Sequence, residues 1–150
     1  YEAETEAQSV HIENAEADTD LFAAIDAEKL ADKVCALFCG VLHDETLGRF
    51  RRMLTIEQFR TPELAALYTG RFVNRMTDYH RELFHRLIAS GVLIDADPAL
   101  LSLAYVSPIL VLLGICDRQP ELEESCIEKL RAHVRLFYHT YNRKKREENP

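Results

Sequence analysis

The chain has 150 residues, of which 47% are hydrophobic, and a formal net charge of −7. This length fits one domain with a real core, and the hydrophobic content excludes a mainly disordered protein. The acidic balance excludes nucleic-acid binding over a broad face, because such binding rests on clustered lysine and arginine. We interpret the one dense basic run, residues 143–146, as cations that balance the dipole at a helix end.

The four cysteines form no Cys-x-x-Cys pair, and the chain is not a small cysteine-dense scaffold. No secretory leader is visible. The longest apolar stretch, residues 99–116, is interrupted by Ser102, Ser107 and Pro108, so it is short for a membrane span. These features predict a cytoplasmic protein that does not enter a membrane.

Residues 1–20 are acidic and contain no lysine or arginine, which is typical of a poorly packed lead-in. Residues 21–150 are expected to form a single domain. Within them apolar residues recur every three or four positions, and no strand-like alternation occurs. Asp26 can cap a first helix that ends near His43, and a second helix is expected over residues 45–59.

A third, long helix is expected over residues 62–90. Thr61 supplies its cap and Pro62 its first helical position, and Gly91 is the kind of residue that ends a helix. Its apolar side is expected to carry Leu64, Leu67, Tyr68, Phe72, Met76, Tyr79, His80, Leu83 and Leu87.

The fourth helix starts at Asp97 and Pro98, and the fifth is expected over residues 120–144. Because the fourth helix is apolar on every side from residue 100 to residue 116, it is expected to be buried on several sides. Pro108 is expected to kink it or to loosen one turn. The sequence therefore predicts an all-α fold, an antiparallel bundle of five to six helices.

The last two helices carry more apolar surface than one chain of this size can cover, and a large exposed patch usually marks an interface. Two helices from each of two copies would form a four-helix interface with two-fold symmetry. The residues expected at this homodimer interface are Leu112, Leu113, Cys116, Ile127, Leu130, Val134, Phe137, Tyr138 and Tyr141.

Catalytic signatures are missing: no Gly-x-Ser-x-Gly, phosphate loop or dinucleotide turn occurs. Glu82 and His85 form one Glu-x-x-His, whereas a di-iron bundle needs two. Cys35, Cys39 and His43 line one side of a helix and could share a soft metal such as Zn²⁺. A straight helix seldom gives three ligands to one metal, so the cysteines are better explained as small buried hydrophobes. We predict no enzymatic activity, no cofactor and no metal.

Two polar residues lie on apolar helix faces. Glu57 extends the stripe of Leu47, Phe50 and Leu54, so it is expected to point inward, where a carboxylate needs a partner. That partner is either an arginine, such as Arg60 or Arg71, or a cationic ligand. His80 is either a hydrogen-bonded core residue or a polar group inside a ligand cavity.

The stretch from about residue 50 to residue 141 resembles the C-terminal ligand-binding and dimerisation domain of the TetR family of bacterial transcriptional repressors. The runs that carry the resemblance are Arg51–Ala65, Leu87–Gly91, Asp97–Pro98, Tyr105–Ile109 and His133–Phe137. The N-terminal helix-turn-helix of that family does not occur in this chain, so DNA would be bound only through a domain that the chain does not contain.

The resemblance implies a repressor that a small molecule releases from DNA by shifting its helices. It implies a homodimer and an apolar or cationic effector. The alternative is a stand-alone helical dimerisation or protein-interaction module without a ligand. In such domains the pocket lies among the helices before the final pair, which here implies Phe38, Phe50, Leu54, Glu57, Phe72, Met76, Tyr79, His80 and Tyr105.

Overall fold

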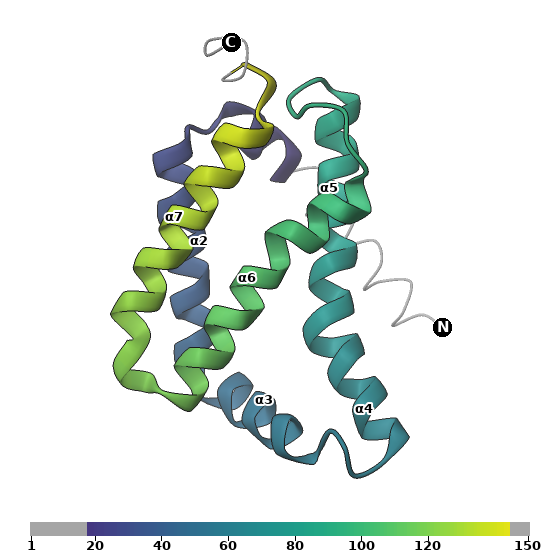
Figure 1. The fold of residues 1–150 in the computed structure, drawn as a ribbon, viewed down its shortest axis with the longest axis vertical. Coiled ribbons are helices and arrows are strands. Elements are labelled where there is room, and N and C mark those ends of the chain that lie inside the picture. Colours follow the sequence, from purple (N-terminus) through teal and green to yellow (C-terminus); the bar gives the residue numbers. More distant parts are fainter. Residues whose placement is uncertain (1–17, 145–150) are drawn as a thin grey trace.

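A computed structural model of the chain describes residues 18–144, and these residues form helices and no strand, which confirms the predicted all-α class. Residues 18–24 are helical, so three residues assigned to the lead-in belong to a helix, while residues 1–17 lie outside the described part. The elements that follow are α2 (Ala27–His43), α3 (Glu45–Glu57), α4 (Pro62–Tyr68), η1 (Thr69–Asn74), α5 (Arg75–Ala89), α6 (Pro98–Arg118), η2 (Pro120–Leu122) and α7 (Glu123–Tyr141) (Figure 1).

The predicted helix starts are confirmed by their caps. The carboxylate of Asp26 accepts a hydrogen bond from the backbone N–H of Lys29, and the hydroxyl of Thr61 accepts one from Leu64. Asp97 caps α6 in the same way. These side chains satisfy backbone N–H groups that the first turn of a helix leaves without partners.

The sequence predicted one long, regular third helix, and this prediction is wrong. The π-helical turn η1 separates α4 from α5. A π turn accommodates one extra residue, is rare, and is frequently found at functional sites. It begins at Thr69 and Gly70, two weak helix formers. The extra residue rotates the face of α4 relative to α5, and consequently no residue of α4 is buried, whereas Leu83, Phe84 and Leu87 of α5 are.

Two other helix ends differ from the prediction. α3 stops at Glu57, and the expected last residue, Phe59, is 88% exposed in the loop that follows. The expected fifth helix starts with the short 3-10 turn η2, after which α7 ends at Tyr141. Two backbone hydrogen bonds then hold the end of α7 against the α5–α6 loop. The N–H of Ile94 donates to the carbonyl of Tyr141, and the N–H of Arg143 donates to the carbonyl of Val92.

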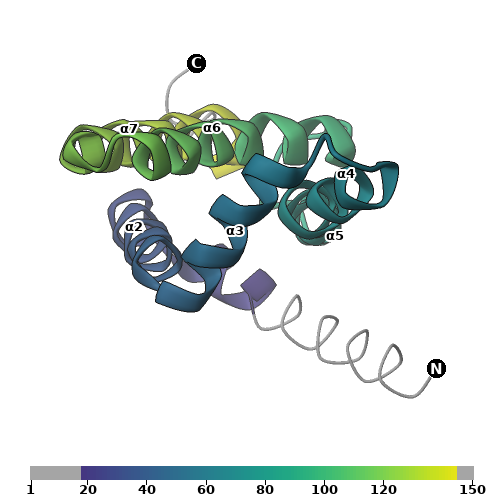
Figure 2. The ribbon, with the colours of Figure 1, turned by 90° about the horizontal axis from the view of Figure 1, so that it is seen from below.

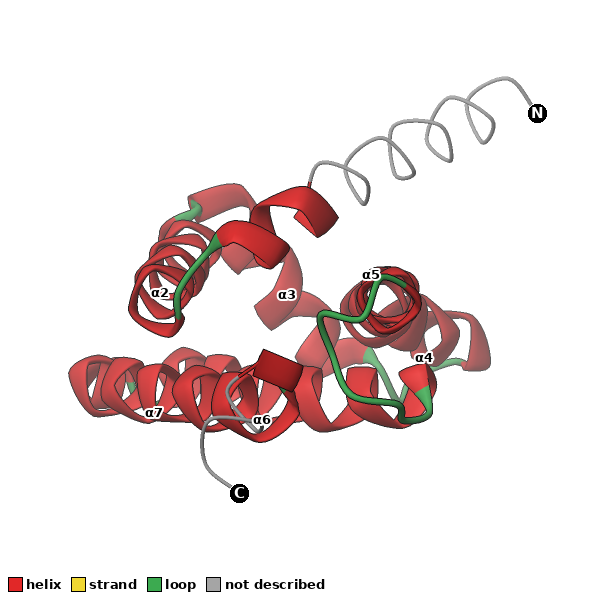
Figure 3. Ribbon diagram, turned by 90° about the horizontal axis from the view of Figure 1, so that it is seen from above, coloured by secondary structure: helices red, strands yellow, loops and turns green. Residues whose placement is uncertain are grey.

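The helices form two layers, which Figures 2 and 3 show edge-on from opposite ends. One layer contains α6 and α7, and the other contains α2, α3 and α5. The main core lies between the layers, where Ala31, Leu87, Val106, Leu130 and Val134 are fully buried. Ion pairs of Arg135 with Glu28 and of Arg131 with Asp32 tie α7 to the rim of α2.

α6 remains a single helix through Pro108, but it is buried on one side only, whereas the sequence predicted burial on several sides. Tyr105, Ile109 and Leu112 face the core, whereas the opposite side of α6 lies open. Among residues 18–144, α6 alone has the length and hydropathy to cross a membrane, a test that core helices of soluble proteins also pass.

Candidate functional site

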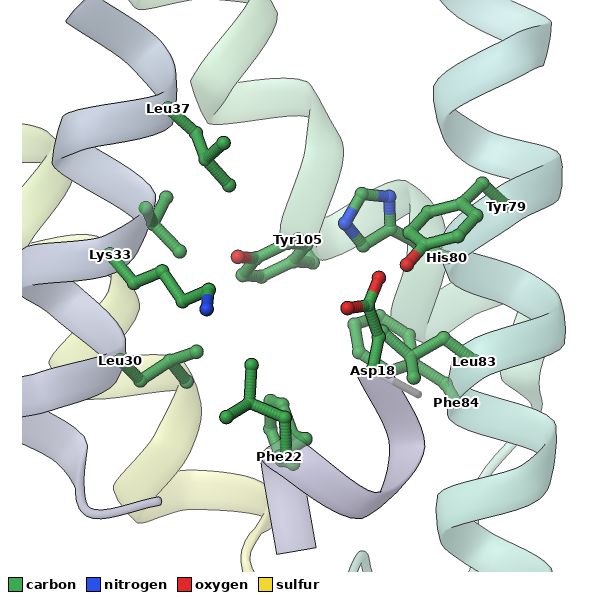
Figure 4. A pocket seen from close by; sticks show the side chains of 12 residues that line it. Asp18, Phe22, Leu30, Lys33, Leu37, Tyr79, His80, Leu83, Phe84 and Tyr105 are labelled. Carbon is green, nitrogen blue, oxygen red and sulfur yellow. The ribbon is translucent and has the colours of Figure 1, made fainter. Parts of the chain in front are cut away.

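A central cavity lies where the helix of residues 18–24 meets α2, α5 and α6 (Figure 4). Its volume is about 120 Å³, close to that of a cavity that holds a single aromatic ring. The lining is mainly apolar with a few polar groups, the composition expected of a ligand site. It consists of Asp18, Leu21, Phe22, Leu30, Lys33, Val34, Leu37, Tyr79, His80, Leu83, Phe84 and Tyr105.

His80 and Tyr105 are the polar groups deepest in the central cavity. Nδ1 of His80 lies 2.8 Å from the carbonyl oxygen of Met76, so the neutral ring donates there and turns Nε2, a hydrogen-bond acceptor, toward other partners. Burial lowers the pKa of His80, which keeps the ring neutral at pH 7. Burial also raises the pKa of the Tyr105 phenol, which therefore keeps its proton.

An aromatic cluster fixes these two rings. The ring centroid of Tyr105 lies 5.0 Å from His80, 5.5 Å from Phe84 and 4.9 Å from Phe137. The carbonyl oxygen of Tyr105 is also 2.8 Å from Nε2 of His133. In Figure 4 the hydroxyl of Tyr105 points across the cavity toward α2. The cluster therefore presents a phenol and an imidazole in fixed positions to any molecule that enters.

The neutral state of His80 predicts a pH dependence of folding. Because burial, its largest cause, lowers the folded pKa below the ordinary 6.5, the unfolded chain binds the proton more readily, despite the opposing effects of the Met76 carbonyl and Asp18. This contribution to stability is complete above pH 6.5 and is lost as the pH falls below it. The free energy of unfolding in urea should change less between pH 7.5 and 5.5 for His80→Gln than for the parent chain.

The matched control for this measurement is His85→Gln, because His85 lies on the same helix and is exposed. That variant should keep the pH dependence of the parent chain. Identical pH profiles for the parent chain and His80→Gln would show that His80 is not held neutral by its surroundings.

A second, larger cavity, the basic cavity, lies between the end of α2, α3, the segment from Tyr68 to Met76, and α6. Its volume of about 520 Å³ is within the range typical of small-molecule sites. It is lined by Val41, Leu47, Arg51, Arg52, Thr55, Ile56, Tyr68, Arg71, Phe72, Val73, Met76, Leu110, Leu113, Gly114, Asp117 and Arg118.

A buried ion pair forms part of the wall of the basic cavity. Nε and Nη2 of Arg51 donate to the two carboxylate oxygens of Asp117, at 2.5 and 2.8 Å, and both side chains are largely buried. This bidentate geometry is the strongest arrangement of the two groups. The sequence offered a signal for Arg51, which occupies a helical position between Leu47 and Leu54 where an apolar residue is expected, but nothing paired it with a residue 66 positions away.

The predicted ligand-binding residues divide between the two cavities. Tyr79, His80 and Tyr105 line the central cavity, whereas Phe72 and Met76 line the basic cavity. Phe50 packs on Phe72 with ring centroids 5.9 Å apart. The remaining apolar candidates, Phe38 and Leu54, are buried and line neither of the two cavities.

Glu57 does not point inward as the sequence predicted. It is the last residue of α3, its side chain is 32% exposed, and it accepts a hydrogen bond of 2.8 Å from Arg60, one of the two arginines expected as its partner. The stripe of α3 ends before Glu57 because the helix itself ends there. Glu57, the carboxylate that was expected to bind a cationic ligand, therefore lines neither cavity. The charged groups of the basic cavity are mostly arginines.

Most residues predicted at the dimer interface are buried within the single chain. Their side chains are 7% exposed or less and belong to the core of the chain, so they have no surface left for a partner. This assignment is corrected for Leu112, Cys116, Leu130, Val134, Phe137 and Tyr138. The other three, Leu113, Ile127 and Tyr141, are partly buried against the same core. Periodicity alone placed the apolar stripe correctly but could not tell which side of the layer it faces.

On α6 and α7, exposed apolar side chains lie on the side that faces away from the core. This outer face consists of Leu100, Leu103 and Val111 of α6 and Leu136 of α7, which are 64%, 54%, 59% and 68% exposed. No helix of residues 18–144 covers it in Figures 2 and 3.

Three of the four cysteines, Cys35, Cys116 and Cys126, are buried in the core as small hydrophobes, and Cys39 is partly exposed. Cys35 is buried and directs its thiol toward the carbonyl oxygen of Ile127, and burial raises its pKa. Burial, together with a hydrogen bond to Cys126, raises the pKa of Cys116 to about 12. Nε2 of His43 instead lies 2.5 Å from Oε1 of Glu123. Residues 18–144 contain no cluster of three metal-ligating side chains, so Cys35, Cys39 and His43 do not converge on one ion.

No family model, no curated protein and no solved structure matches this chain.

Proposed function

We propose that the chain is the ligand-sensing and dimerisation domain of a TetR-like bacterial transcriptional repressor. The observation that carries the proposal is the combination, in one helical domain, of cavities between the layers and an uncovered apolar face on α6 and α7. The effector binds between the layers, a second copy covers the outer face, and DNA is held by a domain outside this chain.

The helix of residues 18–24 provides a physical link between the cavity and the N-terminal side of the chain. Asp18, Leu21 and Phe22 line the central cavity, so an occupant of that cavity touches this helix directly. Phe22 also packs on Tyr138 of α7, with ring centroids 6.3 Å apart, and Tyr138 donates a hydrogen bond to the carbonyl of Ile25. A ligand that favours one position of this helix would shift whatever precedes it.

Self-association through the outer face tests the proposal. In sedimentation equilibrium at tens of micromolar, we expect a species of twice 17.3 kDa. Leu136→Glu should weaken the dimer at least about 30-fold, because a two-fold interface buries the new carboxylate twice.

Phe59→Glu makes the same change on an exposed residue away from the outer face, and it should leave the dimer intact. A monomeric parent chain, or a Leu136→Glu variant that still dimerises, would contradict the proposed arrangement. A dimer that binds no small molecule would instead favour the stand-alone interaction module.

A further inference from the structure

The basic cavity carries a charge opposite to that of the chain. Four guanidinium groups, those of Arg51, Arg52, Arg71 and Arg118, face it together with the single carboxylate of Asp117. The chain as a whole has a net charge of −7. Arginine clusters of this kind recognise carboxylates and phosphates, because the planar guanidinium presents several donors at once.

Three of these arginines have no carboxylate partner. Arg51 is paired with Asp117, but within residues 18–144 Arg52, Arg71 and Arg118 form no ion pair. Arginines elsewhere on the described helices are mostly paired, as in Arg49–Glu45, Arg60–Glu57, Arg81–Asp78, Arg86–Glu82, Arg131–Asp32 and Arg135–Glu28. The unpaired donors are therefore concentrated at this cavity.

Two glycines allow arginine side chains to lie back along the cavity wall. A Cβ atom at Gly48 would lie 3.0 Å from Nη1 of Arg52, and one at Gly114 would lie 3.2 Å from Nη1 of Arg118. In each case the arginine follows its glycine by four residues, one helical turn. The missing side chains leave room for the two guanidinium groups, one on α3 and one on α6, to lie against their own helices.

Apart from Thr55 and the hydroxyl of Tyr68, the rest of the cavity wall is apolar. The ring of Phe72 packs at a tilt against those of Phe50 and Tyr68, at centroid distances of 5.9 and 5.3 Å, and Met76 continues this surface along α5. Leu110 and Leu113 face it from α6. An aromatic ring or an alkyl chain would lose contact with water on this surface.

We infer that the basic cavity binds a small amphipathic anion, with its acidic group among Arg52, Arg71 and Arg118 and its apolar body against Phe72 and Met76. This deepens the proposed function, on which it rests for the role of the bound molecule as effector. The volume fits a small molecule, and the arrangement of charges disfavours the cationic effector that the sequence suggested.

Calorimetric titration of the chain with decanoate tests this assignment, with decanol and decyltrimethylammonium as neutral and cationic ligands of the same chain length. All three are used below the concentration at which they aggregate, so that binding reports single molecules and not a lipid surface. We expect decanoate to bind about 10-fold more tightly than decanol, and the cation to bind most weakly.

Arg52→Gln, Arg71→Gln and Arg118→Gln should each weaken decanoate binding about 5-fold while leaving decanol binding unchanged. All three residues are exposed, so these substitutions should leave the chain folded. Arg49→Gln is the matched control, because Arg49 lies on α3, pairs with Glu45 and does not line the cavity.

Equal affinities for decanoate and decanol would overturn the inference, as would equal losses in Arg49→Gln and the three cavity variants. A chain that dimerises but prefers no anion overturns this inference and leaves the proposed dimer standing. A monomeric chain that binds decanoate as described would overturn the proposed dimer and leave this inference standing.

Discussion

Phe137→Glu is expected to unfold the chain, although the sequence placed Phe137 on a dimer surface. The ring stacks on Phe84 at 5.3 Å and contacts Tyr105 and Tyr141 at 4.9 and 4.8 Å. Losing a buried phenylalanine costs about 3–5 kcal/mol by itself, and burying a carboxylate among aromatic rings adds to that cost. The sum is comparable to the whole stability of a domain, about 5–15 kcal/mol.

Circular dichroism and urea unfolding would measure this loss. We expect the helical signal of Phe137→Glu to collapse, or its unfolding midpoint to fall to very low urea. The neighbouring substitution Leu136→Glu is the matched control, since it introduces the same charge one residue away on the exposed side of α7. It should remain folded while losing the dimer.

The two variants together decide how α7 is oriented. A folded, monomeric Phe137→Glu would mean that Phe137 faces a partner and that the aromatic cluster does not hold the layers together. An unfolded Leu136→Glu would mean that the outer face is part of the core.

The helices were predictable from the sequence wherever local chemistry specifies them. Asp26, Thr61 and Asp97 supply caps whose hydrogen bonds involve residues two or three positions away, so the starts of α2, α4 and α6 could be read directly. The π turn at Thr69–Asn74 was not predictable in the same way, because a single extra residue leaves almost the same apolar pattern before and after it.

The positions of side chains relative to the layers were predictable only in part. Tyr79, His80 and Tyr105 line the central cavity. Periodicity put Tyr79 and His80 on the apolar side of the long helix, and Tyr105 belongs to the apolar helix that follows Pro98. α6 was harder, because a helix that is apolar all round gives no periodic signal of which side faces the core. Phe137 of α7 was misplaced for another reason: periodicity identified its apolar stripe but did not tell whether that stripe faces the core of the chain or a partner.

Charge pairing was the least predictable property. Glu57 and Arg60 are three residues apart, so their ion pair was among the alternatives that the sequence offered. Arg51 and Asp117 belong to helices that meet only in the folded chain, and the cost of burying a charge indicates that a partner exists without identifying it. The basic cavity was missed for this reason, since its arginines come from α3, η1 and α6.

The pair of Arg51 and Asp117 gives the second large effect that we expect. Removing one partner of a buried ion pair leaves the other charge buried without compensation, which typically costs about 3–5 kcal/mol. Arg51→Met and Asp117→Leu should each destabilise the chain by that amount. The double variant should be more stable than either single variant, because it leaves no unpaired charge.

Urea unfolding of the four proteins forms a double-mutant cycle in which the coupling energy isolates the ion pair from other effects of the substitutions. Additive losses would show that the two side chains act independently, contrary to their bidentate geometry. Asp117→Asn extends the cycle to the ligand: it removes the one carboxylate that faces the basic cavity and frees Arg51, so decanoate affinity should rise even as stability falls. Opposite changes in stability and affinity within one variant would separate the structural role of Asp117 from its effect on the charge of the cavity.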